Sequence, residues 1–261
     1  VLVAAAAGSG KTTVITQRLI ELLKREVDPS KIYVITYTNA AADELKQRVG
    51  ASCAASYIGT IHGLAAKILA TNGVNIGDIL NEENFDELFN RIEDNLGKIK
   101  MPEVEHLLID EFQDICKTEY DFCFDMLRPH NYFVVGDSSQ QIYGFKGSSK
   151  EYFMNMVDDP FIELYLLHAN YRSGSRIIAF GEKFLEDMPG IYQVKNYCMR
   201  PVRGKVETSE INFELLCETI QEKSSYRDWF VLARTNSEID DLLYILKKHE
   251  IPCTTFTKAG K

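Results

Sequence analysis

The sequence has no long apolar run and no paired cysteines. Its longest uninterrupted apolar segments, such as Leu164–Leu167, are far shorter than the roughly 20 residues that span a bilayer, so we expect no membrane segment. The six cysteines are scattered, without a Cys-x-x-Cys pair or nearby histidine clusters, which argues against a zinc site. Reduced thiols favour a cytoplasmic protein, associated with the nucleoid if it is bacterial. The first residue is not Met, so an upstream targeting segment stays open.

The sequence also lacks an excess of positive charge. Its formal net charge is −9, which argues against a protein that coats nucleic acid through overall basicity but leaves room for a local basic groove. Acidic residues concentrate in Asp78–Asp94 and Glu103–Asp125. One short basic stretch contains Lys195, Arg200, Arg203 and Lys205. That stretch is either a solvated surface or a nucleic-acid contact, and the sequence alone leaves both open.

The sequence does contain a regular alternation of short apolar runs and helical patterns. The apolar runs are Val1–Val3, Ile32–Ile35, Leu107–Ile109, Phe133–Val135, Ile162–Leu167 and Trp229–Leu232. The helical patterns are Thr13–Lys24, Ala40–Val49 with Asn39 as its expected N-cap, Leu64–Ala70, Asn84–Leu96 and Glu238–Lys248. Continuously apolar runs are typical of parallel strands that are buried on both faces. We therefore predict an α/β protein with a parallel sheet flanked by helices and with its ligand site beyond the carboxyl ends of the strands.

The clearest motif follows the first apolar run and extends from Ala5 to Thr12. It matches the phosphate-binding pattern G-x-x-x-x-G-K-[ST], except that Ala5 stands at the first position. Backbone N–H groups in this loop are expected to converge on phosphate oxygens, together with the positive end of the following helix. Lys11 would neutralise the phosphates, and the Thr12 hydroxyl would bind Mg²⁺. The motif therefore predicts a site for ATP and Mg²⁺, whose expected nucleotide contacts are Ala7, Gly8, Ser9, Gly10, Lys11, Thr12 and Thr13.

A pair of acidic residues, Asp110 and Glu111, ends the apolar run Leu107–Ile109. Adjacent side chains at a strand end point in different directions, so one carboxylate can reach a metal ion while the other faces the terminal phosphate. Asp110 is the expected ligand of Mg²⁺, and Glu111 is expected to orient or deprotonate the attacking water. Two acids at a strand end are also common as surface charge. The phosphate-binding loop elsewhere in the same predicted sheet favours the catalytic interpretation.

Seven segments together resemble the motifs of the UvrD/Rep/PcrA group of superfamily 1 DNA helicases, in the family's order along the chain. They are Ala5–Thr12 for motif I, Ile35–Ala42 for Ia, Ile58–Ala65 for Ib, Asp110–Asp114 for II, Val135–Gly147 for III, Asn170–Ser173 for IV and Val231–Asn236 for IVa. The resemblance implies a recA-like P-loop NTPase domain followed by a second, partial recA-like domain. It also implies that ATP hydrolysis depends on DNA.

The resemblance implies catalytic roles for residues outside the phosphate-binding loop. Gln140 would sense the γ-phosphate and link it to the DNA site, because a neutral amide can bond phosphate, water and a neighbour at once. Arg172 would act as an arginine finger that stabilises charge in the transition state. Tyr171 would stack against adenine. The structural alternative for this pair is a core tyrosine and a surface arginine.

The same resemblance implies a path for single-stranded DNA. Tyr37, Tyr143 and Phe145 occupy positions where the family stacks bases. Stacking suits a protein that moves along DNA of any sequence, because each base has a π-face. The other implied DNA contacts are Asn39, Thr60, His62, Arg234 and Asn236. Each aromatic residue taken alone fits a hydrophobic core as well as a stacking platform. His62 equally fits the role of a structural histidine.

Several residues depart from the family's pattern. Ala6 stands where glycine is usual, and Ser138 and Ser139 stand where acidic residues are common. Lys146 replaces the usual arginine, which would weaken any bidentate contact because lysine lacks the planar guanidinium group.

The domain organisation also departs from the family. Only 47 residues separate His62 from Asp110, which is too few for the inserted 1B subdomain. No motif V or VI is found in the sequence. We therefore expect a 1A domain over residues 1–150, with a short insertion at about 71–103 in place of 1B, and a partial 2A domain over residues 151–261.

These features predict an ATP-dependent DNA helicase or translocase that acts on single-stranded DNA or DNA junctions, with a nuclease or a replication or repair protein as a further candidate partner. Closure of 1A against 2A around ATP would move the strand. One alternative is an ATP-gated, single-stranded-DNA-binding or regulatory subunit without unwinding activity. Another is a P-loop kinase, which leaves Asn170–Arg172 unexplained. Because motifs V and VI are missing, we expect this chain to bind ATP more readily than it hydrolyses ATP.

Overall fold

The computed structural model of the protein describes residues 1–82, 84–141, 148–188, 190–208, 210, 212–222 and 226–255. The chain forms two compact units, Val1–Val206 and Glu207–Lys261. These units do not test the predicted boundary between two recA-like domains at residues 150 and 151, which stays a prediction. Among the described residues, no helix is both long enough and apolar enough to cross a membrane.

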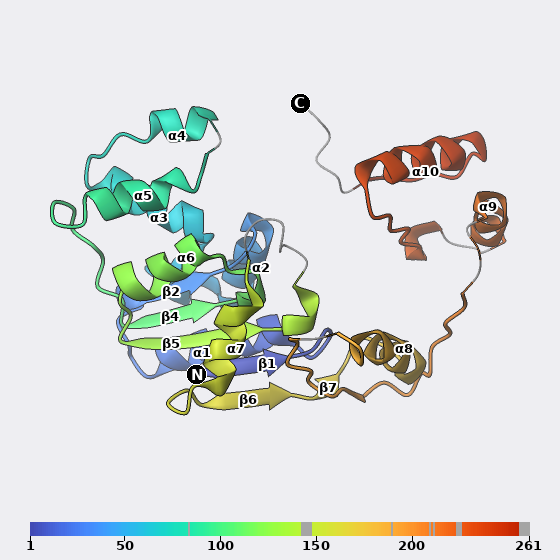
Figure 1. The fold of residues 1–261 in the computed structure, drawn as a ribbon, viewed down its shortest axis with the longest axis horizontal. Helices are drawn as coiled ribbons and strands as arrows, with labels where there is room; N and C mark the ends of the chain where they lie inside the picture. The colour runs from blue at the N-terminus through green and yellow to red at the C-terminus, as the bar shows by residue number, and fades with distance from the viewer. Residues whose placement is uncertain are drawn as a thin grey trace. The chain divides into compact units, whose positions relative to one another are not determined.

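A six-stranded sheet forms the centre of the first unit (Figure 1). Its strands, in spatial order, are β3 (Tyr57–Gly59), β2 (Ile32–Ile35), β4 (His106–Ile109), β5 (Asn131–Gly136), β1 (Leu2–Ala5) and β6 (Leu164–Leu167). All five pairs of neighbouring strands are parallel, so their carboxyl ends lie at one edge. The predicted α/β fold with a parallel sheet is therefore confirmed. A separate pair of short parallel strands, β7 (Ala169–Asn170) and β8 (Tyr197–Cys198), follows later in the chain.

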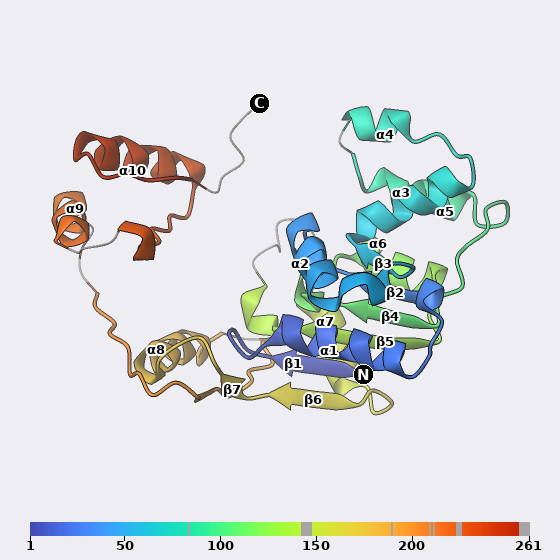
Figure 2. The ribbon, with the colours of Figure 1, turned by 180° about the vertical axis from the view of Figure 1, so that it is seen from behind.

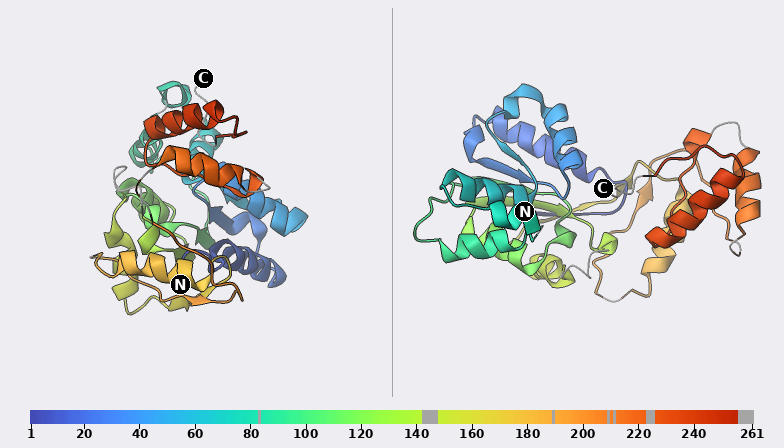
Figure 3. Two further views of the ribbon diagram at one scale, coloured as in Figure 1. Left: turned by 90° about the vertical axis from the view of Figure 1, so that its right-hand side faces the viewer. Right: turned by 90° about the horizontal axis from the view of Figure 1, so that it is seen from above.

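Helices cover both faces of this sheet, as the opposite views of Figures 1 and 2 show. One face packs against α1 (Lys11–Lys24) and α2 (Asn39–Val49), whose inward side chains include Ile15, Leu19 and Leu45. The other face packs against α3 (Ile61–Thr71), α5 (Glu87–Asp94), α6 (Lys117–Asp121) with the π-helix Phe122–Met126, and α7 (Lys150–Asp158). The remaining helices of this unit are α4 (Gly77–Glu82) and α8 (Ser175–Leu185). Figure 3 shows the two helical layers on either side of the strands. The central strands β1, β2 and β4 are thus buried on both faces, which explains their unalternating apolar sequences, whereas the edge strand β6 is partly exposed.

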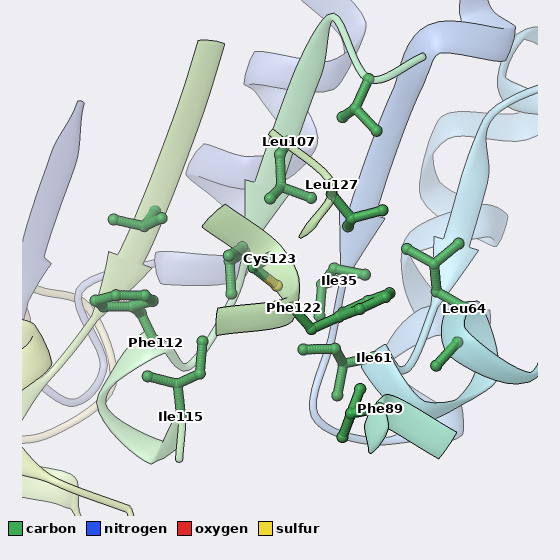
Figure 4. Packing of buried hydrophobic residues seen from close by; sticks show 14 of the residues in the cluster. Ile35, Ile61, Leu64, Phe89, Leu107, Phe112, Ile115, Phe122, Cys123 and Leu127 are labelled. Carbon is green, nitrogen blue, oxygen red and sulfur yellow. The ribbon is translucent and has the colours of Figure 1, made fainter. Parts of the chain in front are cut away.

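Phe122 lies at the centre of the larger core (Figure 4). Its ring packs at 5.2 Å from the ring of Phe89 on α5, measured between centroids. Ile35, the last residue of β2, and Ile61, the first residue of α3, belong to the same cluster. The short helices of residues 71–103 are therefore anchored in the main core by apolar contacts.

Two predictions about local structure were wrong. The N-cap of α2 is Thr38 rather than Asn39, because Thr38 is extended and its Oγ1 accepts the backbone N–H of Ala41 at 3.1 Å. Asn39 is instead the first helical residue. Trp229–Leu232 is not a strand, and Leu232 is 88% exposed. A strand needs a neighbouring strand to satisfy its backbone, and the described part of the second unit offers none.

The second unit is built on α9 (Phe213–Gln221) and α10 (Asn236–Lys248). Its small core consists of Cys217, Ile220, Leu246 and Ile251, with Trp229 packed against it. The start of α10 is fixed by a capping box in which Thr235 and Glu238 exchange hydrogen bonds.

Candidate nucleotide-binding site

The loop between β1 and α1 has the backbone conformation of a phosphate-binding loop. Gly8 and Gly10 have φ values of 77° and 93°, a left-handed region that side-chain-bearing residues seldom adopt. Gly10 directly precedes α1, so the first N–H groups of that helix face the loop. The buried Ser9 donates its hydroxyl to the carbonyl of Ala6 at 2.6 Å and closes the turn. Ala7, within the loop, and Thr13, in the first turn of α1, are both exposed.

The first turn of α1 lies against the end of β4. Lys11 Nζ is 3.5 Å from Glu111 Oε2, and Thr12 Oγ1 donates to Asp110 Oδ2 at 3.5 Å. Lys11 is buried, so its ammonium group is held within the site rather than in solvent. The structure therefore brings together the four residues that the sequence assigned to phosphate, metal and water. They reach one place because β1 and β4 end at the same edge of the sheet.

Burial is the main cause that raises the pKa values of Asp110 and Asp114, the two aspartates that follow β4. Asp110 is only 7% exposed, and burial, followed by the neighbouring Glu111 carboxylate, raises the pKa of Asp110 to about 6. The same two causes raise the pKa of Asp114 to about 6. Such a concentration of buried acid is unfavourable without a compensating cation.

The chemistry of this donor set fits Mg²⁺. Mg²⁺ prefers oxygen ligands and usually binds one or two carboxylates together with phosphates and water. Asp110 and the Thr12 hydroxyl are the two groups that would hold it, and a divalent cation would offset the cost of burying Asp110. The assignment of both residues as metal ligands stays a prediction.

Glu111 has a strained backbone, with φ at 52° although it is not glycine. Strain of this kind is seldom retained unless surrounding contacts hold it in place. Here the Glu111 N–H donates to Asp110 Oδ1 at 3.0 Å, and the Glu111 side chain contacts Lys11. The carboxylate is thereby turned away from the strand and towards the phosphate-binding loop.

Gln140 lies beyond the end of β5, in a short helical turn. Its Nε2 donates to Asp137 Oδ2 at 2.6 Å, while Asp137 Oδ1 accepts the N–H and hydroxyl of Ser139. The adjacent Ser138 Oγ bonds the backbone of Tyr192. Ser138 and Ser139 thus both make hydrogen bonds.

The end of β7 and the residues that follow it pack directly on the phosphate-binding loop. Asn170 Nδ2 donates to the Ala7 carbonyl at 2.7 Å, and the Tyr171 N–H donates to the Gly8 carbonyl at 3.0 Å. A Cβ atom on Gly8 would lie only 2.8 Å from Arg172 Cβ. Tyr171 is 63% exposed and Arg172 is also exposed, so both side chains are accessible beside the loop.

Asn170, Asp114 and Gln113 are buried polar residues of the site to which sequence reasoning assigned no role. Asn170 is 4% exposed, and its Oδ1 accepts the N–H groups of Arg172 and Ser173. All three side chains are buried and form hydrogen bonds, as buried polar side chains in proteins usually do. Their position inside recognised motifs was the only sequence signal available.

The residues predicted to contact DNA fall into four groups, the last of which, Thr60 and His62, lies at the start of α3. Tyr37 and Asn39 are exposed where β2 leads into α2. Arg234 and Asn236 are exposed at the start of α10, in the second unit. Tyr143 and Phe145, like Lys146, lie outside the described residues. All of these assignments stay predictions.

Thr60 and His62 make contacts within the protein. Thr60 caps α3 by accepting the N–H of Gly63 at 3.2 Å. His62 Nε2 lies 3.6 Å from Asp86 Oδ1, and its ring packs against Phe89 with centroids 5.1 Å apart. Both residues therefore have a structural role, whether or not they also contact DNA.

Comparison with known proteins finds similarity to DNA helicases. A family model described as the UvrD/REP helicase N-terminal domain matches residues 1–96 and 84–160. The ATP-dependent DNA helicase PcrA of Leuconostoc citreum is 25% identical, over 96% of this chain and 47% of the relative. A probable DNA helicase II homolog of Mycoplasma capricolum is 23% identical, over 97% and 49%. DNA helicase II of Haemophilus influenzae is 26% identical, over 68% and 37%.

The chain spans about half of the length of the first two of these relatives. Their alignments extend over 354 positions, more than the 261 residues of this chain, so the relatives contain segments without a counterpart here.

Proposed function

Because the chain belongs to the UvrD/REP helicase N-terminal domain family, we propose that it forms the ATP-binding part of an ATP-dependent DNA helicase or translocase that acts on single-stranded DNA. The observation that carries the proposal is the convergence of Lys11, Thr12, Asp110 and Glu111 at one edge of the sheet. A phosphate-binding loop, two candidate metal ligands and a candidate base in one place are the groups that bind a nucleotide with its metal ion and activate water.

Each residue has a distinct task in the proposed reaction. The ammonium group of Lys11 neutralises the phosphates, and the left-handed loop presents N–H groups to their oxygens. Mg²⁺, held by Thr12 and Asp110, would supply further neutralisation of phosphate charge. Glu111 orients the attacking water and accepts its proton. Catalysis therefore depends mainly on positioning and electrostatics.

Gln140 and Arg172 complete the proposed site. Gln140 carries an amide that can bond the γ-phosphate, and its contact with Asp137 places it beyond the end of β5. The Cβ atom of Arg172 lies beside Gly8, and from there its guanidinium group would stabilise charge in the transition state. The exposed ring of Tyr171 supports its proposed stacking on adenine.

The proposed coupling to DNA is tested by the rate of ATP hydrolysis in the full chain, measured with and without single-stranded DNA. We expect DNA to raise kcat. Lys11→Ala should abolish turnover by weakening nucleotide binding, whereas Glu111→Gln should lower kcat by about 100-fold or more, leave a measurable residual rate and preserve binding. Equal rates with and without DNA would refute the coupling and leave a DNA-independent ATPase.

An ATP-gated, single-stranded-DNA-binding subunit is a second candidate. It is favoured by the small size of residues 71–103, the short insertion predicted in place of 1B, whose described part contains the two short helices α4 and α5. A strand-displacement assay distinguishes the candidates. A helicase separates a duplex with a single-stranded tail when ATP is added, whereas a clamp binds the tail and leaves the duplex intact.

A further inference from the structure

Gln113 is a buried amide that lies between two acidic residues after β4, Glu111 and Asp114, and a third after β5, Asp137. It is 2% exposed and follows Glu111 by two residues. Its Nε2 donates to Glu111 Oε2 at 3.0 Å and to Asp114 Oδ2 at 3.3 Å, and its Oε1 accepts the backbone N–H of Asp137 at 2.8 Å. One side chain thus joins the loop after β4 to the loop after β5.

The orientation of this amide is fixed by its neighbours. The N–H of Asp137 can only donate, so the oxygen of Gln113 must face it, and the NH₂ group then faces the carboxylates of Glu111 and Asp114. The approach is close, since a Cβ atom on Gly136 would lie 2.9 Å from Gln113 Oε1. Glycine at position 136 leaves the space that the amide needs.

The contacts extend on both sides of Gln113. On one side Glu111 lies 3.5 Å from Lys11 of the phosphate-binding loop. On the other side the Asp137 carboxylate accepts a hydrogen bond from Gln140. A continuous series of polar contacts therefore connects Lys11, through Gln113, with the residue proposed to sense the γ-phosphate.

From this geometry we infer that Gln113 is a positioning residue for ATP hydrolysis: it holds the Glu111 carboxylate in its catalytic orientation and ties it to the strand end that carries Gln140. The inference rests on the proposed function, because it requires Glu111 to activate water. Gln113 itself touches neither phosphate nor water in this role. Its removal leaves the nucleotide contacts of the P-loop in place and frees Glu111 to rotate.

The test uses steady-state ATP hydrolysis by the full chain in the presence of single-stranded DNA. Gln113→Leu removes every side-chain hydrogen bond at similar size, and Gln113→Glu keeps an acceptor for the Asp137 N–H but, in its ionised form, loses the donor to Glu111. Both should lower kcat by about 10- to 100-fold while the KM for ATP changes less than about threefold. Cys123→Ala, which removes a fully buried thiol from the hydrophobic core of the same unit, is the matched control and should keep wild-type kcat. If Gln113→Leu does not fold, Gln113→Glu decides the result.

A second measurement separates positioning from general damage. In a Glu111→Gln background the base is already lost, so adding Gln113→Leu should lower the residual kcat by less than about twofold. The same loss in both backgrounds would overturn the inference, as would a wild-type kcat in Gln113→Glu. A wild-type protein that hydrolyses no ATP would instead overturn the proposed function and the inference with it.

Discussion

The buried carboxylate of Asp110 should destabilise the protein at neutral pH when no cation is bound. Asp110→Asn removes the charge, and the amide oxygen can still accept the Glu111 N–H that Asp110 accepts at 3.0 Å. Because burial raises the pKa of Asp110 from 3.8 to about 6, the native protein retains this proton at pH values where the unfolded chain has lost it. The free energy of unfolding should therefore fall as the pH rises from about 4 to about 6.

The size of the effect follows from this shift. Each unit of pKa corresponds to about 1.4 kcal/mol, so the ionised Asp110 should cost roughly 3 kcal/mol above pH 6. Asp110→Asn should be more stable than wild type by this amount at pH 8 and equally stable near pH 4. Asp114, whose pKa is also raised to about 6, contributes the same slope to both proteins and cancels in the comparison.

Urea denaturation between pH 4 and pH 8, with a chelator and without nucleotide, measures this difference. The exposed Asp187→Asn is the control and should change stability by less than about 0.5 kcal/mol at every pH. Adding Mg²⁺ and ATP should reverse the order, because binding stabilises wild type more than Asp110→Asn. A pH-independent difference, or a variant less stable than wild type at pH 8 without Mg²⁺, would refute the reasoning.

Three further predictions concern other parts of the molecule. Asn170→Ala removes three hydrogen bonds of a buried side chain and should lower the free energy of unfolding by about 2 to 3 kcal/mol in urea denaturation; unchanged stability would contradict its role. Gly8→Ala, at a φ of 77°, should weaken binding of a fluorescent ATP analogue by at least about tenfold. Leu246→Ala should destabilise the second unit by about 2 to 4 kcal/mol, seen by hydrogen exchange, while ATP binding in the first unit stays at wild-type strength.

The sequence was sufficient to predict the parallel sheet and the edge at which the polar motifs gather. Continuous apolar runs that alternate with helical patterns are typical of strands buried on both faces, and a motif that directly follows a strand lies at its carboxyl end. Asp110 and Thr12 are 98 residues apart, yet their meeting required only that β1 and β4 run in the same direction. Local pattern and topology together therefore locate this part of the site.

Contacts that depend on the path of a side chain were not predictable in this way. Asn170 bonds Ala7 across 163 residues, and neither propensity nor spacing encodes that pairing. Two suitable caps, Thr38 and Asn39, are adjacent, and the helix register decides between them. Trp229–Leu232 has the composition of a strand, but strand formation depends on a partner strand that local composition does not specify.

The central claim is that Lys11, Thr12 and Asp110 form one binding site for ATP and Mg²⁺. Titration calorimetry of the full chain with a non-hydrolysable ATP analogue tests it most directly. We predict binding by wild type that weakens on removal of Mg²⁺, loss of binding in Lys11→Ala, and loss of the Mg²⁺ dependence in Asp110→Asn. Wild-type affinity in Lys11→Ala, or an Mg²⁺ dependence that persists in Asp110→Asn, would contradict the account.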